Sequence, residues 1–184
     1  MDEILIDTVC KKFFKKPSRF TDLINGAFFD EKHIIDEEQL DLWDSEESNI
    51  IETSYGGHKR SLERYRNITM KAVIDDQEVL VTLENQTRND YSMVIRIMIY
   101  NALNYLKQWN ISDMSVNERT LLPVMTYMVH WGQDTMLCQR ELKGLLKDIP
   151  KTLMKHMNNS KMQSVDIKDV DVSKFKDKEV VSAI

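Results

Sequence analysis

Two strand-like segments joined by a two-residue turn, with a long helical pattern after them, restrict the fold more than any other feature of the chain. Residues 61–74 begin with charged side chains and continue as an apolar strand, Asp75-Asp76 is a hairpin turn, and residues 77–87 form a second strand. Apolar residues then recur at helical spacing over residues 89–109. Residues 120–132 form a further buried strand, so a helix separates two strands and a crossover with partly parallel pairing is expected. The pattern predicts an α/β fold with a small mixed β-sheet flanked by helices.

The remaining elements are predicted from helix and strand signals. Residues 3–16 are expected to form a helix that ends in four lysines, and Pro17 then begins a second helix with Ser18 as its N-cap. Gly26 inside that helix either shortens it or permits close packing. The acidic residues 30–57 are expected to be a surface excursion with one short helical or extended piece. Further along the chain, a short helix is predicted over 140–150 and a short strand over 162–167.

Length and composition fit one globular domain. The chain has 184 residues, of which 42% are apolar and 30% are charged. We expect residues 1–167 to form the domain and residues 168–184 to be a tail, either frayed or the start of a C-terminal extension. The net charge is −5, so a nucleic-acid interaction would require a local basic patch.

Cysteine content and hydropathy indicate a cytoplasmic protein with no membrane partner. Cys10 and Cys138 are far apart and form no C-x-x-C pair, which excludes a zinc ribbon and suits a reducing compartment. The acidic N-terminus lacks the charge and the apolar run of a signal peptide. No apolar run has the length of a membrane span.

The second strand ends in the sequence Glu84-Asn85-Gln86, a polar ending for an apolar strand. Glu84 and Gln86 lie on one face of the strand because side chains alternate, and Asn85 lies on the other. In a hairpin about Asp75-Asp76, Asn67 pairs with Glu84. A carboxylate with neighbouring oxygens can hold a hard divalent cation. The commoner explanation of such a pair is a solvated strand end, and the spacing alone leaves both open.

The chain resembles the Rpn family of recombination-promoting nucleases, also called YhgA-like putative transposases, which have a PD-(D/E)xK nuclease core. The resemblance covers residues 20 to about 167, and its most specific part is the ENQ-to-helix block. The matching stretches are "FTDLINGAFFDEKHIIDEEQL", "RYRNITMKAV", "LENQTRNDYSMVIRIMIYNALNYLKQ" and "LLPVMTYMVHWGQ" followed by "LKDIP".

The resemblance implies a restriction-endonuclease-like fold and a Mg²⁺- or Mn²⁺-dependent endonuclease acting on DNA. Carried over by position, Glu84 is a metal ligand and Gln86 takes the place of the catalytic lysine. The family's aspartate falls at position 67, where this chain has Asn67. Because asparagine offers only a neutral oxygen, we expect metal binding and turnover to be impaired, whether the change is natural or deliberate. Asp22 is a further candidate metal ligand, and a role as a helix-face or capping carboxylate is as plausible.

Five basic residues are candidates for DNA contact, because Lys and Arg bind backbone phosphates. Arg96 shares a helix face with Met93 and Tyr100, and a structural ion pair is favoured over contact with a phosphate or pairing with a site carboxylate. Two of the other four precede the first hairpin strand and two lie in its charged start, on the face opposite to Asn67, and a solvated strand start is an equal alternative for all four. These candidates are Lys59, Arg60, Arg64, Arg66 and Arg96.

Two functions follow as expectations. The first is a metal-dependent DNA endonuclease, or its disabled copy, with a role in recombination or in defence against foreign DNA implied by the resemblance alone. The second is a catalytically inactive module of nuclease fold that binds DNA or protein, which Asn67 and the acidic charge favour. A homodimer is plausible for the first function, because cutting both strands of a duplex requires two sites.

Overall fold

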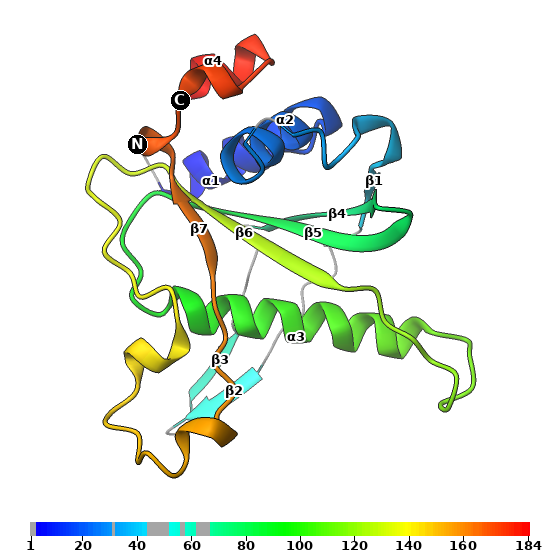
Figure 1. The fold of residues 1–184 in the computed structure, drawn as a ribbon, viewed down its shortest axis with the longest axis vertical. Helices are drawn as coiled ribbons and strands as arrows, with labels where there is room; N and C mark the ends of the chain where they lie inside the picture. The colour runs from blue at the N-terminus through cyan, green and yellow to red at the C-terminus, as the bar shows by residue number, and fades with distance from the viewer. Residues whose placement is uncertain (1–2, 31, 44–51, 56–57, 62–66) are drawn as a thin grey trace.

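The protein is an α/β structure built on one five-stranded mixed sheet (Figure 1). The computed structural model describes residues 3–30, 32–43, 52–55, 58–61 and 67–184. The helices are α1 (Glu3–Phe14), α2 (Pro17–Phe28), α3 (Met93–Ile111) and α4 (Lys178–Ala183). The sheet has the order β1-β4-β5-β6-β7, and β2 pairs with β3 separately. The strands are β1 (Asp41–Leu42), β2 (Glu52–Tyr55), β3 (His58–Ser61), β4 (Asn67–Ile74), β5 (Gln77–Gln86), β6 (Val124–His130) and β7 (Gln163–Asp166).

The predicted hairpin is confirmed with its register. β4 and β5 are antiparallel, and Asn67 pairs with Glu84 while Ile74 pairs with Gln77. Both turn residues adopt positive φ angles, 49° at Asp75 and 61° at Asp76. This left-handed pair suits the right-handed twist of the flanking strands, and aspartate tolerates it better than most residues do. The turn therefore sets which residue of β4 lies beside Glu84.

Replacing Asp76 by glycine is expected to raise the free energy of unfolding by about 1 kcal/mol, because glycine adopts a positive φ without steric cost. Asp76→Ala is the matched control and is expected to lower stability, since alanine keeps the strain. Urea denaturation of the three proteins measures both effects. Equal stability of the glycine and alanine variants would show that backbone strain at this position is negligible.

The crossover predicted from the helix between two strands is also present. β5 and β6 are parallel, with Leu80 paired to Val124, and α3 connects them across the sheet. β7 adds a second parallel pair, Tyr127 to Gln163. The three carboxyl ends of β5, β6 and β7 therefore meet at one edge of the sheet.

Helices cover both faces of the sheet (Figure 1), and an apolar cluster lies on each face. On one face, Leu23 and Ile24 of α2 pack with Val81 and Leu83 of β5 in the main core cluster. On the other face, a smaller cluster joins α3 to β6. Its members are Met93, Val94, Ile97, Met128 and Met162, with Met136 and Cys138 packed against it.

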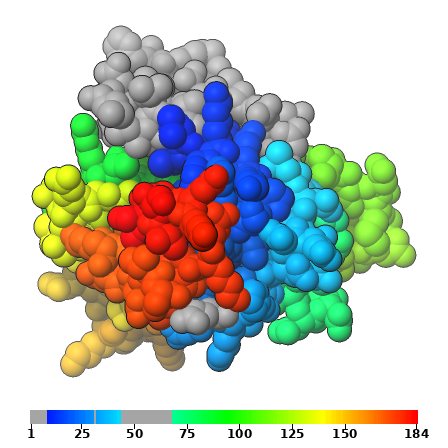
Figure 2. All heavy atoms as spheres, turned by 90° about the horizontal axis from the view of Figure 1, so that it is seen from above, coloured from blue at the N-terminus to red at the C-terminus, as the bar shows by residue number. Residues whose placement is uncertain are grey.

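The C-terminal residues pack against the N-terminal helices, as Figure 2 shows for the red and blue segments. Phe175 and Val180 are buried in the main core. A Cβ added at Gly26 would come within 2.7 Å of ring carbons of Phe175, so this glycine permits close packing within α2. Glu179 forms an ion pair with Arg19. The expectation that residues 168–184 form a frayed tail is therefore wrong. The domain boundary at residue 167 stays a prediction.

Several predicted boundaries are wrong for local reasons. The N-cap of α2 is Lys16, with Pro17 at the first helical position, and Ser18 caps nothing. The short helix over 140–150 is reduced to one 3₁₀ turn, Leu142–Leu145. The described part of the acidic excursion contains three short elements where one was expected: a 3₁₀ turn, Glu37–Gln39, and the strands β1 and β2. Among the described helices, none combines the length and apolarity needed to cross a membrane.

Candidate functional site

Glu84 lies on the α3 face of the sheet, within β5 and next to its carboxyl end. Strand alternation directs Thr82, Glu84 and Gln86 to this face, while Val81 and Leu83 enter the main core on the other. The Thr82 hydroxyl lies 3.0 Å from that of Thr69 across the hairpin. The Glu84 side chain is fully buried, with 0% exposure. A carboxylate in that environment requires a charged or hydrogen-bonding partner.

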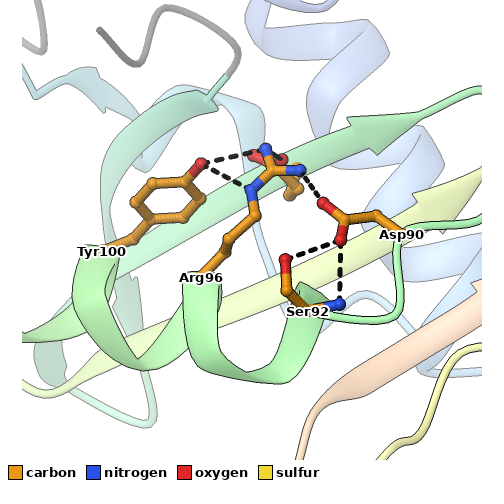
Figure 3. Close-up of polar contacts among 5 residues, drawn as sticks. Asp90, Ser92, Arg96 and Tyr100 are labelled. Atoms are coloured by element: carbon orange, nitrogen blue, oxygen red, sulfur yellow. Dashed lines mark hydrogen bonds and ion pairs between the residues drawn. The ribbon is translucent and has the colours of Figure 1, made fainter. Parts of the chain in front are cut away.

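Arg96 of α3 supplies that partner. Its Nη2 donates to Oε1 of Glu84 at 2.9 Å and to the Tyr100 hydroxyl at 3.0 Å. Its Nη1 donates to Oδ2 of Asp90 at 2.5 Å. Figure 3 shows the guanidinium between Tyr100 and Asp90, with Asp90 also bound to Ser92. Arg96 therefore pairs with Asp90, as expected of a structural ion pair, and also with Glu84, the candidate site carboxylate of the alternative expectation.

The charges in this network stabilise one another. Burial opposes the charged form of Arg96, yet Glu84, Tyr100 and Asp90 outweigh it and raise the pKa of the guanidinium above its usual value. Burial likewise opposes the Asp90 carboxylate, but hydrogen bonds from Ser92 and Arg96 hold the pKa of Asp90 below its usual value. Both groups are therefore ionised at neutral pH.

The depressed pKa of Asp90 predicts a stability change in acid. Folded Asp90 binds fewer protons than the unfolded chain, so its contribution is fully present above the ordinary pKa of 3.8 and is lost as the pH falls through the lower folded pKa. As the pH is lowered from 6 to 2, the midpoint of urea denaturation should fall more steeply for the parent than for Asp90→Asn. Parallel profiles for the two proteins would contradict a stabilising ionised Asp90.

A second polar row lies beside Glu84 at the carboxyl ends of the parallel strands. Gln86 pairs in register with His130, and His130 pairs with Asp166. All three are buried, and the Nδ1 of His130 lies 3.5 Å from Oδ2 of Asp166. Gln86 Oε1, both ring nitrogens of His130 and Oδ1 of Asp166 have no hydrogen-bond partner among the described residues. This row has no local signal in the sequence, because only the parallel registers of β5, β6 and β7 bring the three residues together.

Asp22 does not join Glu84, and its assignment as a metal ligand is wrong. It lies on α2, whose apolar side chains pack on the opposite face of the sheet from α3. Its carboxylate accepts the backbone N–H groups of Lys176 and Asp177 at 2.9–3.1 Å. Of its alternative roles, a helix-face carboxylate fits these contacts, which join α2 to the backbone of the C-terminal tail.

The other predicted residues are placed only in part. The Asn67 backbone lies opposite Glu84, as predicted. Lys59 and Arg60 belong to β3, where only the backbone is described, paired with Ser54 and Thr53. Arg64 and Arg66 lie outside the described residues.

The oxygen ligands of this site are of the kind that a hard divalent cation prefers, but their total negative charge is too small for one. Glu84 supplies one carboxylate, and Gln86 supplies a buried amide oxygen that lacks a described partner. Against this, Arg96 already offsets the charge of Glu84. Groups of three or more His, Cys, Asp and Glu side chains placed for a metal ion do not occur in the described part of the chain. Aspartate at position 67 would add the second carboxylate.

The fold and the site thus define an α/β protein in which buried Glu84 of the mixed sheet pairs with partly buried Arg96 of α3, beside a polar row at the carboxyl ends of the parallel strands. Comparison of the chain with protein-family models, with curated proteins and with solved structures finds no match in any of the three.

Proposed function

We propose that the chain is a metal-dependent DNA endonuclease of the PD-(D/E)xK type, related to the recombination-promoting nucleases and impaired by Asn67. The observation that carries the proposal is the hairpin register, which sets position 67 of β4 opposite Glu84 of β5. Gln86 follows Glu84 by two residues on β5. The succession of hairpin, Glu-x-Gln strand end and helix also supports it, because it agrees with the motif order that the resemblance implies. The carboxyl edge of parallel strands is a common place for α/β active sites.

The chain's own residues would act as follows. Glu84, position 67 and Gln86 would hold Mg²⁺ or Mn²⁺, an ion that lowers the pKa of water and offsets charge on a phosphodiester. Arg96 would orient the Glu84 carboxylate and limit its net charge. Gln86 would orient the attacking water or a phosphate oxygen through its amide. With asparagine at 67, one ligand charge is missing, so turnover would be low.

A second candidate is a nuclease-fold module that binds DNA or protein without catalysis. The observation that favours it is the same ion pair, because a guanidinium 2.9 Å from Glu84 already provides the positive charge that the carboxylate requires. A module of this kind would bind its partner equally well with and without a divalent cation.

The experiment that separates the two is relaxation of supercoiled plasmid by the Asn67→Asp variant in Mg²⁺ or Mn²⁺. Cleavage that depends on both the metal and Glu84 supports the nuclease. A folded Asn67→Asp protein that cuts no faster than its Glu84→Ala derivative rejects it.

A further inference from the structure

A loop between β6 and β7 carries a net positive charge in a chain that is acidic overall. We define residues 140–161 as the basic loop. It contains six Lys or Arg residues and two acidic residues, a net charge of +4 with His156 neutral, in a chain of net charge −5. The six cations are Arg140, Lys143, Lys147, Lys151, Lys155 and Lys161.

The base of the basic loop is closed by hydrogen bonds. Met162 N donates to the Arg140 carbonyl at 2.8 Å, and Leu142 N donates to the Ser160 carbonyl at 3.0 Å. Glu141 and Lys161 form an isolated antiparallel bridge, and Met162 is buried in the α3 cluster. Figure 1 shows the loop, yellow to orange, extending beyond the sheet on the side where α3 lies. The loop is thus held on the same side of the sheet as Glu84.

Four of the six cations are available to a partner. Glu141 engages the other two, Lys143 at 2.8 Å and Lys161 at 3.5 Å. The remaining four are exposed and form no ion pair with any residue that the structure describes. They are Arg140, Lys147, Lys151 and Lys155. Unpaired cations on one anchored loop concentrate positive charge locally in an acidic protein, which is what a nucleic-acid interaction requires here.

We propose that the basic loop binds the phosphate backbone of nucleic acid. Lysine and arginine side chains bind phosphates without reading sequence and release counterions when they do so. The exposed Leu146, Leu153 and Met154 raise an anionic membrane as the other class of partner. The loop contains only 3₁₀ turns of four and three residues, Leu142–Leu145 and Met154–His156, so it has no continuous apolar helix face to insert into lipid. The choice of duplex DNA as the probe rests on the proposed function.

The test is the binding of a fluorescent 25-base-pair duplex, measured by anisotropy in EDTA over a series of salt concentrations. The triple variant Lys147→Gln, Lys151→Gln, Lys155→Gln is compared with Lys12→Gln, Lys16→Gln, Lys178→Gln, which removes the same charge from exposed lysines of the N-terminal helices and α4. The loop variant should bind at least about tenfold more weakly at 0.1 M salt. Its slope of log K against log salt should be shallower by about 2–3, because each phosphate contact contributes about 0.9.

Three results would overturn the proposal: no binding by the parent, equal weakening by both triple variants, or loop-dependent binding to anionic phosphatidylserine vesicles without binding to the duplex. Circular dichroism of each variant checks that it is folded. Because EDTA prevents metal-dependent cleavage, this result is independent of catalysis. Loop-dependent binding together with an inert Asn67→Asp variant would reject the nuclease and keep the basic loop.

Discussion

Replacing Arg96 by methionine is expected to lower the free energy of unfolding by about 3–5 kcal/mol, the range seen when one partner of a buried ion pair is removed. Glu84 is fully buried, and the guanidinium of Arg96 donates to its Oε1. Methionine has a similar length but supplies neither charge nor donors, so the buried carboxylate opposite Met128 of β6 would lose its guanidinium partner. Urea denaturation at pH 7 measures the loss.

A double-mutant cycle separates this charge effect from lost packing. Glu84→Gln combined with Arg96→Met removes both charges, and the double variant is expected to be more stable than the sum of the two single changes predicts. Arg96→Lys keeps the positive charge but lacks the planar guanidinium with its several donors. Its free energy of unfolding should therefore lie between those of the parent and Arg96→Met. A loss below about 1 kcal/mol for Arg96→Met would contradict a buried ion pair as the support of Glu84.

The parts of the site that sequence predicted correctly depend on local geometry. The Asp75-Asp76 turn fixes the hairpin register, so the pairing of Asn67 with Glu84 follows from counting residues away from the turn. Arg96 and Tyr100 are four residues apart on α3, and this spacing places both on the helix face that reaches Glu84. In both cases the relevant residues are close in sequence or joined by one turn.

The parts that sequence missed depend on contacts between distant segments. Asp22 accepts the backbone N–H groups of Lys176 and Asp177, which follow it in the sequence by 154 and 155 positions. The residues next to Asp22 in the sequence give no sign of this pairing. The row of Gln86, His130 and Asp166 requires the parallel registers of β5, β6 and β7, which a sequence does not encode locally. The basic loop was missed because its lysines are separated by apolar residues and form no run.

Restoring aspartate at position 67 is expected to give the largest change in activity. A second carboxylate beside Glu84 would offset the charge of Arg96 and supply the ligand charge that Mg²⁺ or Mn²⁺ requires. Removing one stabilising group from an active site typically costs on the order of 10²–10³ in rate, so Asn67→Asp should cleave faster than the parent by about that factor. Glu84→Ala in the Asn67→Asp background is the control, because it removes the buried carboxylate and keeps the new one.

The most direct measurement is therefore the rate of supercoiled-plasmid relaxation in Mn²⁺ for the parent, Asn67→Asp, and Asn67→Asp with Glu84→Ala, each shown to be folded by circular dichroism. Asn67→Asp is expected to cleave about 10²–10³-fold faster than either of the other two proteins, and EDTA should abolish this cleavage. Equal rates for all three folded proteins would contradict the assignment of Glu84 and position 67 to a metal-dependent phosphodiesterase site.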